Sequence, residues 1–215
     1  MKDITTSQSF AQDTIRRGEV VPLMEQFYTI QGEGAHTGKA AYFVRIGGCD
    51  VGCHWCDVKE SWNPDTHPPT PIDSIVEEAK KYSDTVVVTG GEPLTWNMNP
   101  LVDAFRAEGI TVHVETSGAY PLTGNWDWIT LSPKKTAVVK DGYYEHAHEL
   151  KVIVYNRHDL KWAEEHAAKV NDKCTLYLQP EWSKRDEIMP LLVEYILEHP
   201  KWKISLQTHK YLRIP

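Results

Sequence analysis

Short runs of apolar, β-branched residues alternate along this chain with segments whose apolar positions recur at helical spacing. The strand-like runs are residues 41–46, 85–89, 110–115, 128–131, 150–155, 175–179 and 203–207. Helical segments follow residues 70–71, 99–100, 156 and 183–186, and the third of them runs to about Lys169. Repetition of strand, helix and strand predicts an α/β fold with a mostly parallel sheet and helices packed on it.

Signals at the ends of the segments predict where the helices begin. Thr70-Pro71 predicts a cap followed by a proline at the first helical position. Asn99-Pro100 opens the next helix and Gly109 ends it, whereas Ser183–Asp186 resembles a capping box. Residues 61–71, rich in Pro, Asn, Asp and Thr, predict a loop. The apolar faces of the first and last helices are Ile72, Ile75, Val76, Ala79 and Tyr82, and Ile188, Leu191, Leu192, Tyr195 and Ile196.

Composition narrows the possible functions. The 215 residues carry 23 basic and 30 acidic side chains, and this net charge of 23 − 30 = −7 argues against a nucleic-acid or membrane-surface binder. No apolar run approaches the roughly 20 residues that span a bilayer, and residues 1–18 lack the apolar stretch of a signal peptide. We therefore expect a cytoplasmic protein with one domain over residues 1–215, in which about residues 1–18 form a flexible or peripheral segment.

Three cysteines, Cys49, Cys53 and Cys56, follow the first strand-like run with the spacing C-x3-C-x2-C. Three thiolates can hold a [4Fe–4S] cluster and leave one iron open to a ligand, which favours catalysis. The alternative is a structural zinc site with His54, His36 or Cys174 as the fourth ligand. Because structural zinc sites usually carry paired C-x2-C knuckles or a Cys/His second half, the spacing favours the cluster.

The segment Thr89-Gly90-Gly91-Glu92-Pro93 follows another strand-like run. Two glycines there let a ligand approach the backbone closely, and free backbone groups at the carboxyl end of a sheet can hold an ammonium group. The alternative is a plain turn.

Together the two motifs resemble the radical S-adenosylmethionine superfamily, whose cluster motif is C-x3-C-x-aromatic-C, with Trp55 as the aromatic residue. The resemblance implies a full or partial (β/α) barrel. It also implies that the open iron binds the amino and carboxylate groups of S-adenosylmethionine, whose cleavage yields a 5′-deoxyadenosyl radical.

Further segments resemble the family of 7-carboxy-7-deazaguanine synthases, in order from about residue 22 to the last residue. They are Phe27–Gly38, Arg45, Glu115–Gly118, Ser132–Lys134, Gln179–Pro180 and Gln207–Pro215. The resemblance implies a lyase of the queuosine and 7-deazapurine pathway. It would contract the ring of 6-carboxy-5,6,7,8-tetrahydropterin after hydrogen removal at C6, releasing ammonia with the help of Mg²⁺.

The resemblance also assigns residues to the two ligands. Glu33 and the α-carboxylate of Pro215 would pair with the guanidine-like edge of the pterin, and Arg45 with its carboxylate. The substrate-binding residues would be Ile30, Gln31, Gly32, Glu33, Arg45, Thr89, His209 and Pro215. The S-adenosylmethionine-binding residues would be Trp55, Cys56, Asp57, Gly90, Gly91, Glu92, Ser117, Ser132, Pro133, Lys134, Gln179 and Pro180.

One position departs from the family pattern. Many members have threonine after Cys56-Asp57, and that threonine ligates Mg²⁺, whereas this chain has Val58. Valine has no oxygen to offer a hard cation. We expect either that other groups hold Mg²⁺ or that the enzyme depends less on it.

The resemblance further implies a homodimer and a flavodoxin or ferredoxin as reductant, with no nucleic-acid or membrane partner. Two other functions stay open. A glycyl-radical-enzyme activase shares the short barrel and cluster motif, but would have no use for the residues assigned to a pterin. A non-catalytic zinc-binding module would contain one zinc ion and no iron.

Overall fold

The computed structural model describes residue 14 and residues 17–215, and within them nine strands form one curved sheet. The strands are β1 (Val20–Ile30), β2 (Ala40–Ile46), β3 (Pro69–Pro71), β4 (Thr85–Gly90), β5 (Thr111–Thr116), β6 (Trp128–Leu131), β7 (Glu149–Val154), β8 (Thr175–Pro180) and β9 (Trp202–Ile204). Their order across the sheet is β3-β1-β2-β4-β5-β6-β7-β8-β9. Strand β2 and strands β4 to β9 are parallel, whereas β1 pairs antiparallel with both β2 and β3.

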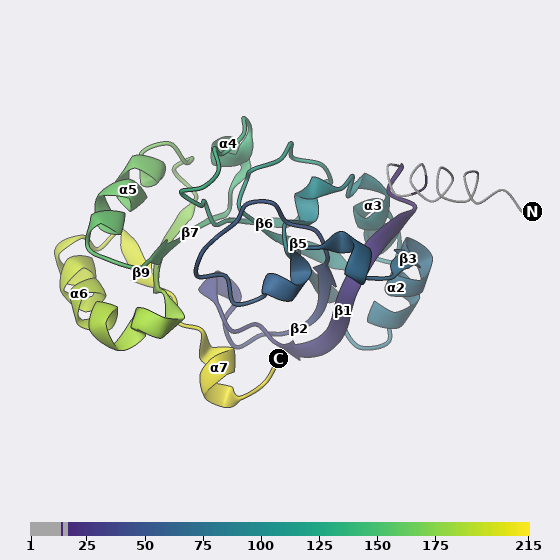
Figure 1. Cartoon of the computed structure of the whole chain (residues 1–215), viewed down its shortest axis with the longest axis horizontal. Coiled ribbons are helices and arrows are strands. Elements are labelled where there is room, and N and C mark those ends of the chain that lie inside the picture. The colour runs from purple at the N-terminus through teal and green to yellow at the C-terminus, as the bar shows by residue number, and fades with distance from the viewer. Residues whose placement is uncertain (1–13, 15–16) are drawn as a thin grey trace, which may run out of the picture.

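The helices lie around the outside of this curve (Figure 1). They are α2 (Ile72–Ala79), α3 (Asn99–Ala107), α4 (Tyr143–His146), α5 (His158–Ala167), α6 (Arg185–Glu198) and α7 (Thr208–Leu212). Short 3-10 helices are η1 (Gly34–His36), η2 (Lys59–Ser61), η3 (Pro64–Thr66), η4 (Pro93–Thr95) and η5 (Trp182–Lys184). Because the edge strands β3 and β9 do not pair, the sheet is an open, partial (β/α) barrel, which confirms the predicted fold class.

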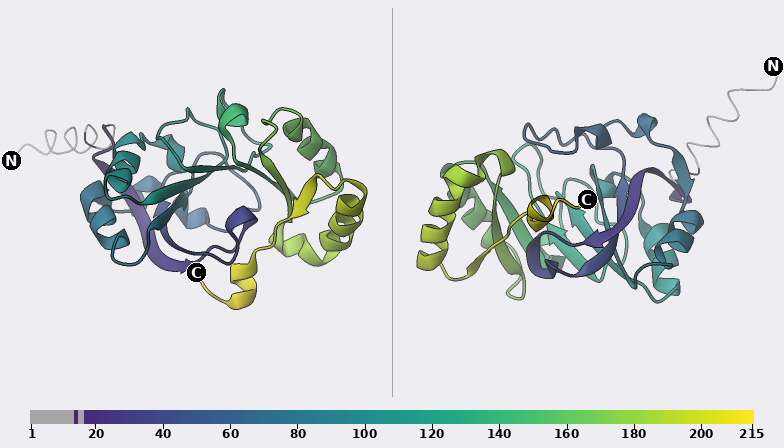
Figure 2. Two further views of the ribbon diagram at one scale, coloured as in Figure 1. Left: turned by 180° about the vertical axis from the view of Figure 1, so that it is seen from behind. Right: turned by 90° about the horizontal axis from the view of Figure 1, so that it is seen from below.

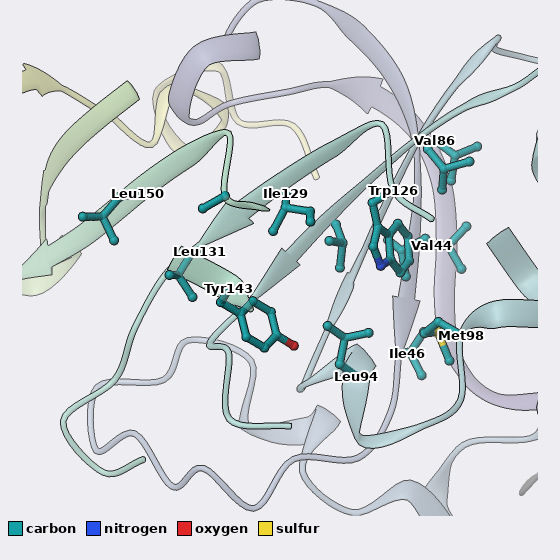
Figure 3. Close-up of a cluster of buried hydrophobic side chains, with 14 of the residues drawn as sticks. Val44, Ile46, Val86, Leu94, Met98, Trp126, Ile129, Leu131, Tyr143 and Leu150 are labelled. Atoms are coloured by element: carbon teal, nitrogen blue, oxygen red, sulfur yellow. The ribbon is translucent and has the colours of Figure 1, made fainter. Parts of the chain in front are cut away.

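Alternation along the strands separates an apolar outer layer from a polar interior. Val86 and Val88 of β4, and Val152 of β7, belong to the core between the sheet and the helices. Figure 3 shows part of this core, with side chains from several strands and from η4. The intervening residues point the other way, so that Glu115 of β5 and Lys151 of β7 line a cavity inside the curve.

The predicted strands are confirmed, but two predicted helix starts are wrong. Thr70 lies in β3, and its hydroxyl donates to the Pro68 carbonyl rather than capping α2, which begins at Ile72. The hydroxyl of Ser183 donates to Glu181, so the expected capping box does not form, and α6 begins at Arg185. The N-cap positions fall instead on Pro71 and Lys184, neither of which makes a side-chain cap hydrogen bond.

Several segments differ from expectation. The strand β1 was not predicted, the loop 61–71 contains β3, and the last strand ends at Ile204 so that α7 can follow. Tyr82 lies beyond α2, half exposed, and stacks on Tyr42 and Tyr28 instead of joining the helix face.

The sequence led us to expect no membrane-spanning helix and a peripheral segment at residues 1–18. No helix in residues 17–215 is both long and apolar enough to cross a bilayer. The segment 1–18, expected to be peripheral, lies mostly outside the described residues.

Candidate active site

A pocket of about 820 Å³ opens inside the curve of the sheet, where the carboxyl ends of the parallel strands meet the loop after β2. It is lined by all three clustered cysteines, by every predicted substrate-binding residue and by every predicted cofactor-binding residue except Pro133. The sequence motifs are therefore brought together in one place. Pro133 is buried beside the pocket without lining it.

We call one part of this pocket the cluster end: the loop Cys49–Asp57, the segment Gly90–Glu92, Ser117 and Ser132–Lys134. Gly90 and Gly91 allow the end of β4 to pack closely against the start of the cysteine loop. Gly91 donates to the Ile46 carbonyl and Glu92 to the Gly48 carbonyl, both at 2.9 Å. A Cβ on Gly90 would lie 2.0 Å from the Ile46 oxygen, and one on Gly91 would lie 2.5 Å from the Gly48 oxygen. Only glycine permits this approach of backbone to backbone.

The three cysteines are free, and burial raises the pKa of the Cys49 and Cys53 thiols. Among the described residues, no three His, Cys, Asp or Glu side chains are arranged to hold a single metal ion. A single zinc would draw its sulfur ligands to about 2.3 Å from one point, whereas a [4Fe–4S] cube takes each thiolate on a separate iron. His36 and Cys174, considered as zinc ligands, do not line the pocket.

Buried polar groups hold the cluster end in shape. The Glu92 carboxylate, 1% exposed, accepts hydrogen bonds from Leu94 N, from Thr116 Oγ1 and from both the backbone and the hydroxyl of Ser117. This carboxylate therefore ties the end of β4 to the end of β5.

Lys134 brings a buried cation to the same end. Its Nζ donates to the carbonyl and hydroxyl oxygens of Ser132 at 2.6 Å and lies 5.6 Å from the centre of the Trp55 ring. Burial lowers the pKa of this lysine.

The opposite part of the pocket, which we call the charged end, consists of Gln31, Glu33, Glu115, Lys151 and Gln207. Lys151 Nζ donates to Glu33 Oε2 and, at 2.9 Å, to Glu115 Oε2. Gln207 Nε2 donates to Glu33 Oε1 at 2.9 Å, and Gln31 Nε2 donates to Glu115 Oε1 at 3.1 Å. Two carboxylates therefore share one ammonium group inside the molecule.

Electrostatics keep Glu33 ionised. Burial by itself would raise the pKa of Glu33, but the charge and hydrogen bond of Lys151, with help from Gln207, lower it to about 2 from an ordinary 4.5. Burial would likewise lower the pKa of Lys151, yet the carboxylates of Glu115 and Glu33 raise it. Because the folded pKa of Glu33 is depressed, its stabilising contribution is complete above about pH 4.5 and is lost as the pH falls towards 2.

Helix α7 lies beside β1 (Figure 1 and the right view of Figure 2), and His209 and Lys210 of this helix line the pocket. Thr208 donates its backbone N–H and its hydroxyl to the Gly32 carbonyl at 2.9 and 3.0 Å. A Cβ on Gly32 would lie 2.2 Å from His209 Nδ1, so the absence of a side chain admits that ring. Lys210 Nζ donates to Asp57 Oδ2 at 2.7 Å and thereby joins α7 to the cysteine loop.

Two other predicted substrate residues, Pro215 and Arg45, make contacts with strand β1. Thr29 donates its hydroxyl to the Pro215 oxygen at 3.5 Å, which holds the last residue at the rim of the pocket. Arg45 Nε donates to Glu25 on the neighbouring strand β1 at 2.7 Å. Since a guanidinium has five N–H donors, this ion pair leaves Arg45 able to bind a second anion.

Sequence reasoning missed several residues that line the pocket. Glu115, Gln207 and Lys210 were noted only as parts of motifs, without a role, and Lys151 was not singled out. The signal for Lys151 was present in the strand Glu149–Val154, where a lysine interrupts a run of apolar residues. A lysine in such a strand needs a buried partner.

Comparison with known proteins gives the family. The model of the radical SAM superfamily matches residues 43–132. The chain is 64% identical over 204 residues to the 7-carboxy-7-deazaguanine synthase of Flavobacterium psychrophilum, covering 95% of this chain and 97% of that protein. It is 46% identical over 194 residues to the synthase of Synechocystis sp., covering 90% and 93%.

This chain belongs to the 7-carboxy-7-deazaguanine synthase family. Its structure also resembles the crystal structure of QueE from Escherichia coli, with a TM-score of 0.77 and 28% identity over 89% of this chain and 96% of that one. Membership makes the chain a radical S-adenosylmethionine enzyme, and implies a [4Fe–4S] cluster and S-adenosylmethionine as its cofactors.

Val58 and Asp57 stand where a departure at the Mg²⁺ position was expected from the sequence. Val58 lines the pocket without a side-chain oxygen, and the neighbouring Asp57 carboxylate is paired with Lys210. These residues do not offer the oxygen ligands that Mg²⁺ requires.

Proposed function

We propose that this enzyme converts 6-carboxy-5,6,7,8-tetrahydropterin to 7-carboxy-7-deazaguanine and ammonia. The observation that carries the proposal is one pocket with three cysteines at one end and a buried, hydrogen-bonded pair of carboxylates at the other. The names of the relatives support the same reaction.

The cluster end fits the cofactors of the family. Cys49, Cys53 and Cys56 would hold the cluster, and the backbone at Gly90–Glu92 would hold the methionine ammonium. Ser117, Ser132 and Lys134 would contact its carboxylate or ribose, while Gln179 and Pro180 would lie near the adenosine. When bound, these cofactors supply the radical that starts the reaction.

The charged end fits a pterin. Glu33 is an ionised acceptor, suited to the N–H donors of a guanidine-like edge. Gln31 and His209, with the backbone at Ile30 and Gly32, would bind the rest of that ring. Arg45 would bind the substrate carboxylate, and Thr89 would add a hydroxyl contact from the inner face of β4.

We assign no step to Mg²⁺, because Val58 and the paired Asp57 do not form a site for it. We further propose a single domain, since every strand in the described residues belongs to one sheet. Four free cysteines favour a reducing compartment such as the cytoplasm. A homodimer and a flavodoxin or ferredoxin reductant are proposed on the family resemblance alone.

The test is anaerobic reconstitution with iron and sulfide. The protein is then incubated with dithionite, S-adenosylmethionine and carboxytetrahydropterin, and the product is detected by mass. We expect about four irons per chain and a product with the mass of 7-carboxy-7-deazaguanine. A colourless protein with one zinc per chain, or a fully loaded protein that leaves the pterin unchanged, would overturn the proposal.

A further inference from the structure

Lys151 supplies the cation of the charged end. Its side chain is 3% exposed, and it projects from the inner face of β7 between two carboxylates that come from distant parts of the chain. Glu33 follows β1, whereas Glu115 lies near the end of β5. Among the described residues, Lys151 is the side chain that donates to both carboxylates and so bridges them. Gln31 also links the Glu115 carboxylate to the backbone N–H of Glu33.

The charges of these three groups do not cancel. Two carboxylates and one ammonium leave one negative charge, which matches a ligand that presents N–H donors. Two partly buried carboxylates without a cation would not both stay ionised as readily, because each would penalise the charge of the other. One of them would keep a proton, and a protonated carboxyl is partly a donor facing a ligand that is itself a donor.

We propose that Lys151 is a positioning residue that keeps Glu33 and Glu115 ionised together and so sets the pocket to accept the donor edge of the pterin. This inference rests on the proposed function and adds to it the residue that fixes the charge state of the site. Lys151 acts through the two carboxylates and needs no contact with the substrate.

Other titratable groups lie near Lys151, and they restrict the pH range in which the binding measurement can be interpreted. Glu149 lies two residues earlier on β7, His209 faces Glu33 from α7, and Lys134 follows β6. Burial lowers the pKa of His209 from 6.5, so this ring is already neutral above neutral pH. In the wild type, measurements from about pH 7 upwards therefore report on the carboxylates and not on the histidine. Removing the Lys151 charge takes away one of the smaller causes that lower the pKa of His209.

The experiment measures binding of carboxytetrahydropterin to the unreduced, cluster-loaded enzyme with S-adenosylmethionine present, so that no turnover occurs. Three variants are compared with the wild type: Lys151→Met, Lys151→Arg, and Lys151→Met combined with Glu115→Gln. The control is Lys203→Met, which removes an exposed lysine of β9 outside the pocket.

We expect Lys151→Met to weaken binding at pH 7 by at least about tenfold. The affinity of Lys151→Met should then rise with pH up to about pH 9, as the proton held by one of the two carboxyl groups leaves. The affinities of the wild type and of Lys203→Met should not change over the same pH range. Lys151→Arg keeps a cation and should bind within about threefold of the wild type. The double variant should bind more tightly than Lys151→Met, because only one carboxylate remains to be ionised.

Wild-type affinity with a flat pH profile in Lys151→Met would overturn the inference. So would weak binding at every pH that Glu115→Gln does not improve, since that is the behaviour of a purely structural lysine. If Lys151→Met does not fold, the double variant and Lys151→Arg decide: failure of both to bind the pterin overturns the inference. If the wild type binds S-adenosylmethionine but not the pterin, the proposed function fails first.

Discussion

The two ends of the pocket are held together in different ways. At the cluster end, successive loops pack backbone against backbone, and the Glu92 carboxylate binds donors from within about 25 residues of itself. At the charged end, Glu33, Glu115, Lys151 and Gln207 come from distant parts of the chain and meet through buried charges. The cluster end therefore depends on shape and the charged end on charge, so substitutions should separate them.

The largest effect should come from Gly91→Ala at the cluster end. The new Cβ would lie 2.5 Å from the Gly48 oxygen and 2.8 Å from Cys49 Cβ, so the cysteine loop must move. We expect most of the iron to be lost and turnover to fall by at least about a hundredfold. Iron and sulfide content measure this. Val138→Ala is the control, because this side chain is 80% exposed. Full iron content in Gly91→Ala would show that the shape of this end is not decisive.

Glu33→Gln should affect the charged end alone. The amide keeps the size of the side chain but loses the charge that pairs with Lys151. We expect pterin affinity to fall by about ten- to a hundredfold, with S-adenosylmethionine affinity unchanged. Titration calorimetry with each ligand measures this, with the exposed Glu77→Gln as control. Equal losses for both ligands would mean that the two ends are not separable.

Lys210→Met tests the contact that joins the two ends. It removes the ion pair between α7 and Asp57, which is partly exposed and therefore modest in strength. We expect both ligands to bind about three- to tenfold more weakly. Adding Asp57→Asn should cost little more, because the same contact is already lost. Additive losses in the double variant would show that the two residues act separately.

Val58→Thr should have the smallest effect. A hydroxyl in this position supplies an oxygen that valine lacks, and we expect turnover to gain a response to Mg²⁺ of about twofold. Assays with added Mg²⁺ and with chelator measure it, and the exposed Val138→Thr serves as control. An unchanged response would place any Mg²⁺ site elsewhere in the pocket.

The contrast between local and long-range contacts also explains which features could be predicted from the sequence. The strands after which the motifs lie were predictable because runs such as Thr85–Gly90 are short, apolar and β-branched. The strand β1 was missed because its apolar and polar residues do not alternate and Pro22 interrupts it. Thr70 and Ser183 looked like helix caps, yet each helix begins two residues after them, so that the cap positions fall on Pro71 and Lys184.

The cluster end was predictable in position because each of its segments is a short motif that can be recognised by itself. Lys151 was not, because its partners Glu33 and Glu115 are 118 and 36 residues away. The register of β5, β6 and β7 brings Glu115 and Lys151 to one interior face, and the loop after β1 adds Glu33. Pairings of this kind depend on the whole sheet and leave no local pattern.

The burial of the Lys151 group has a consequence for ionic strength. Mobile salt ions screen charges that face water, and at about 0.15 M they do so over roughly 8 Å. The exposed pair of Lys80 and Glu77 is open to that screening, whereas Lys151 and its two carboxylates face one another inside the pocket. The affinity of the charged end for its ligand should therefore change little between dilute buffer and the salt of a living cell.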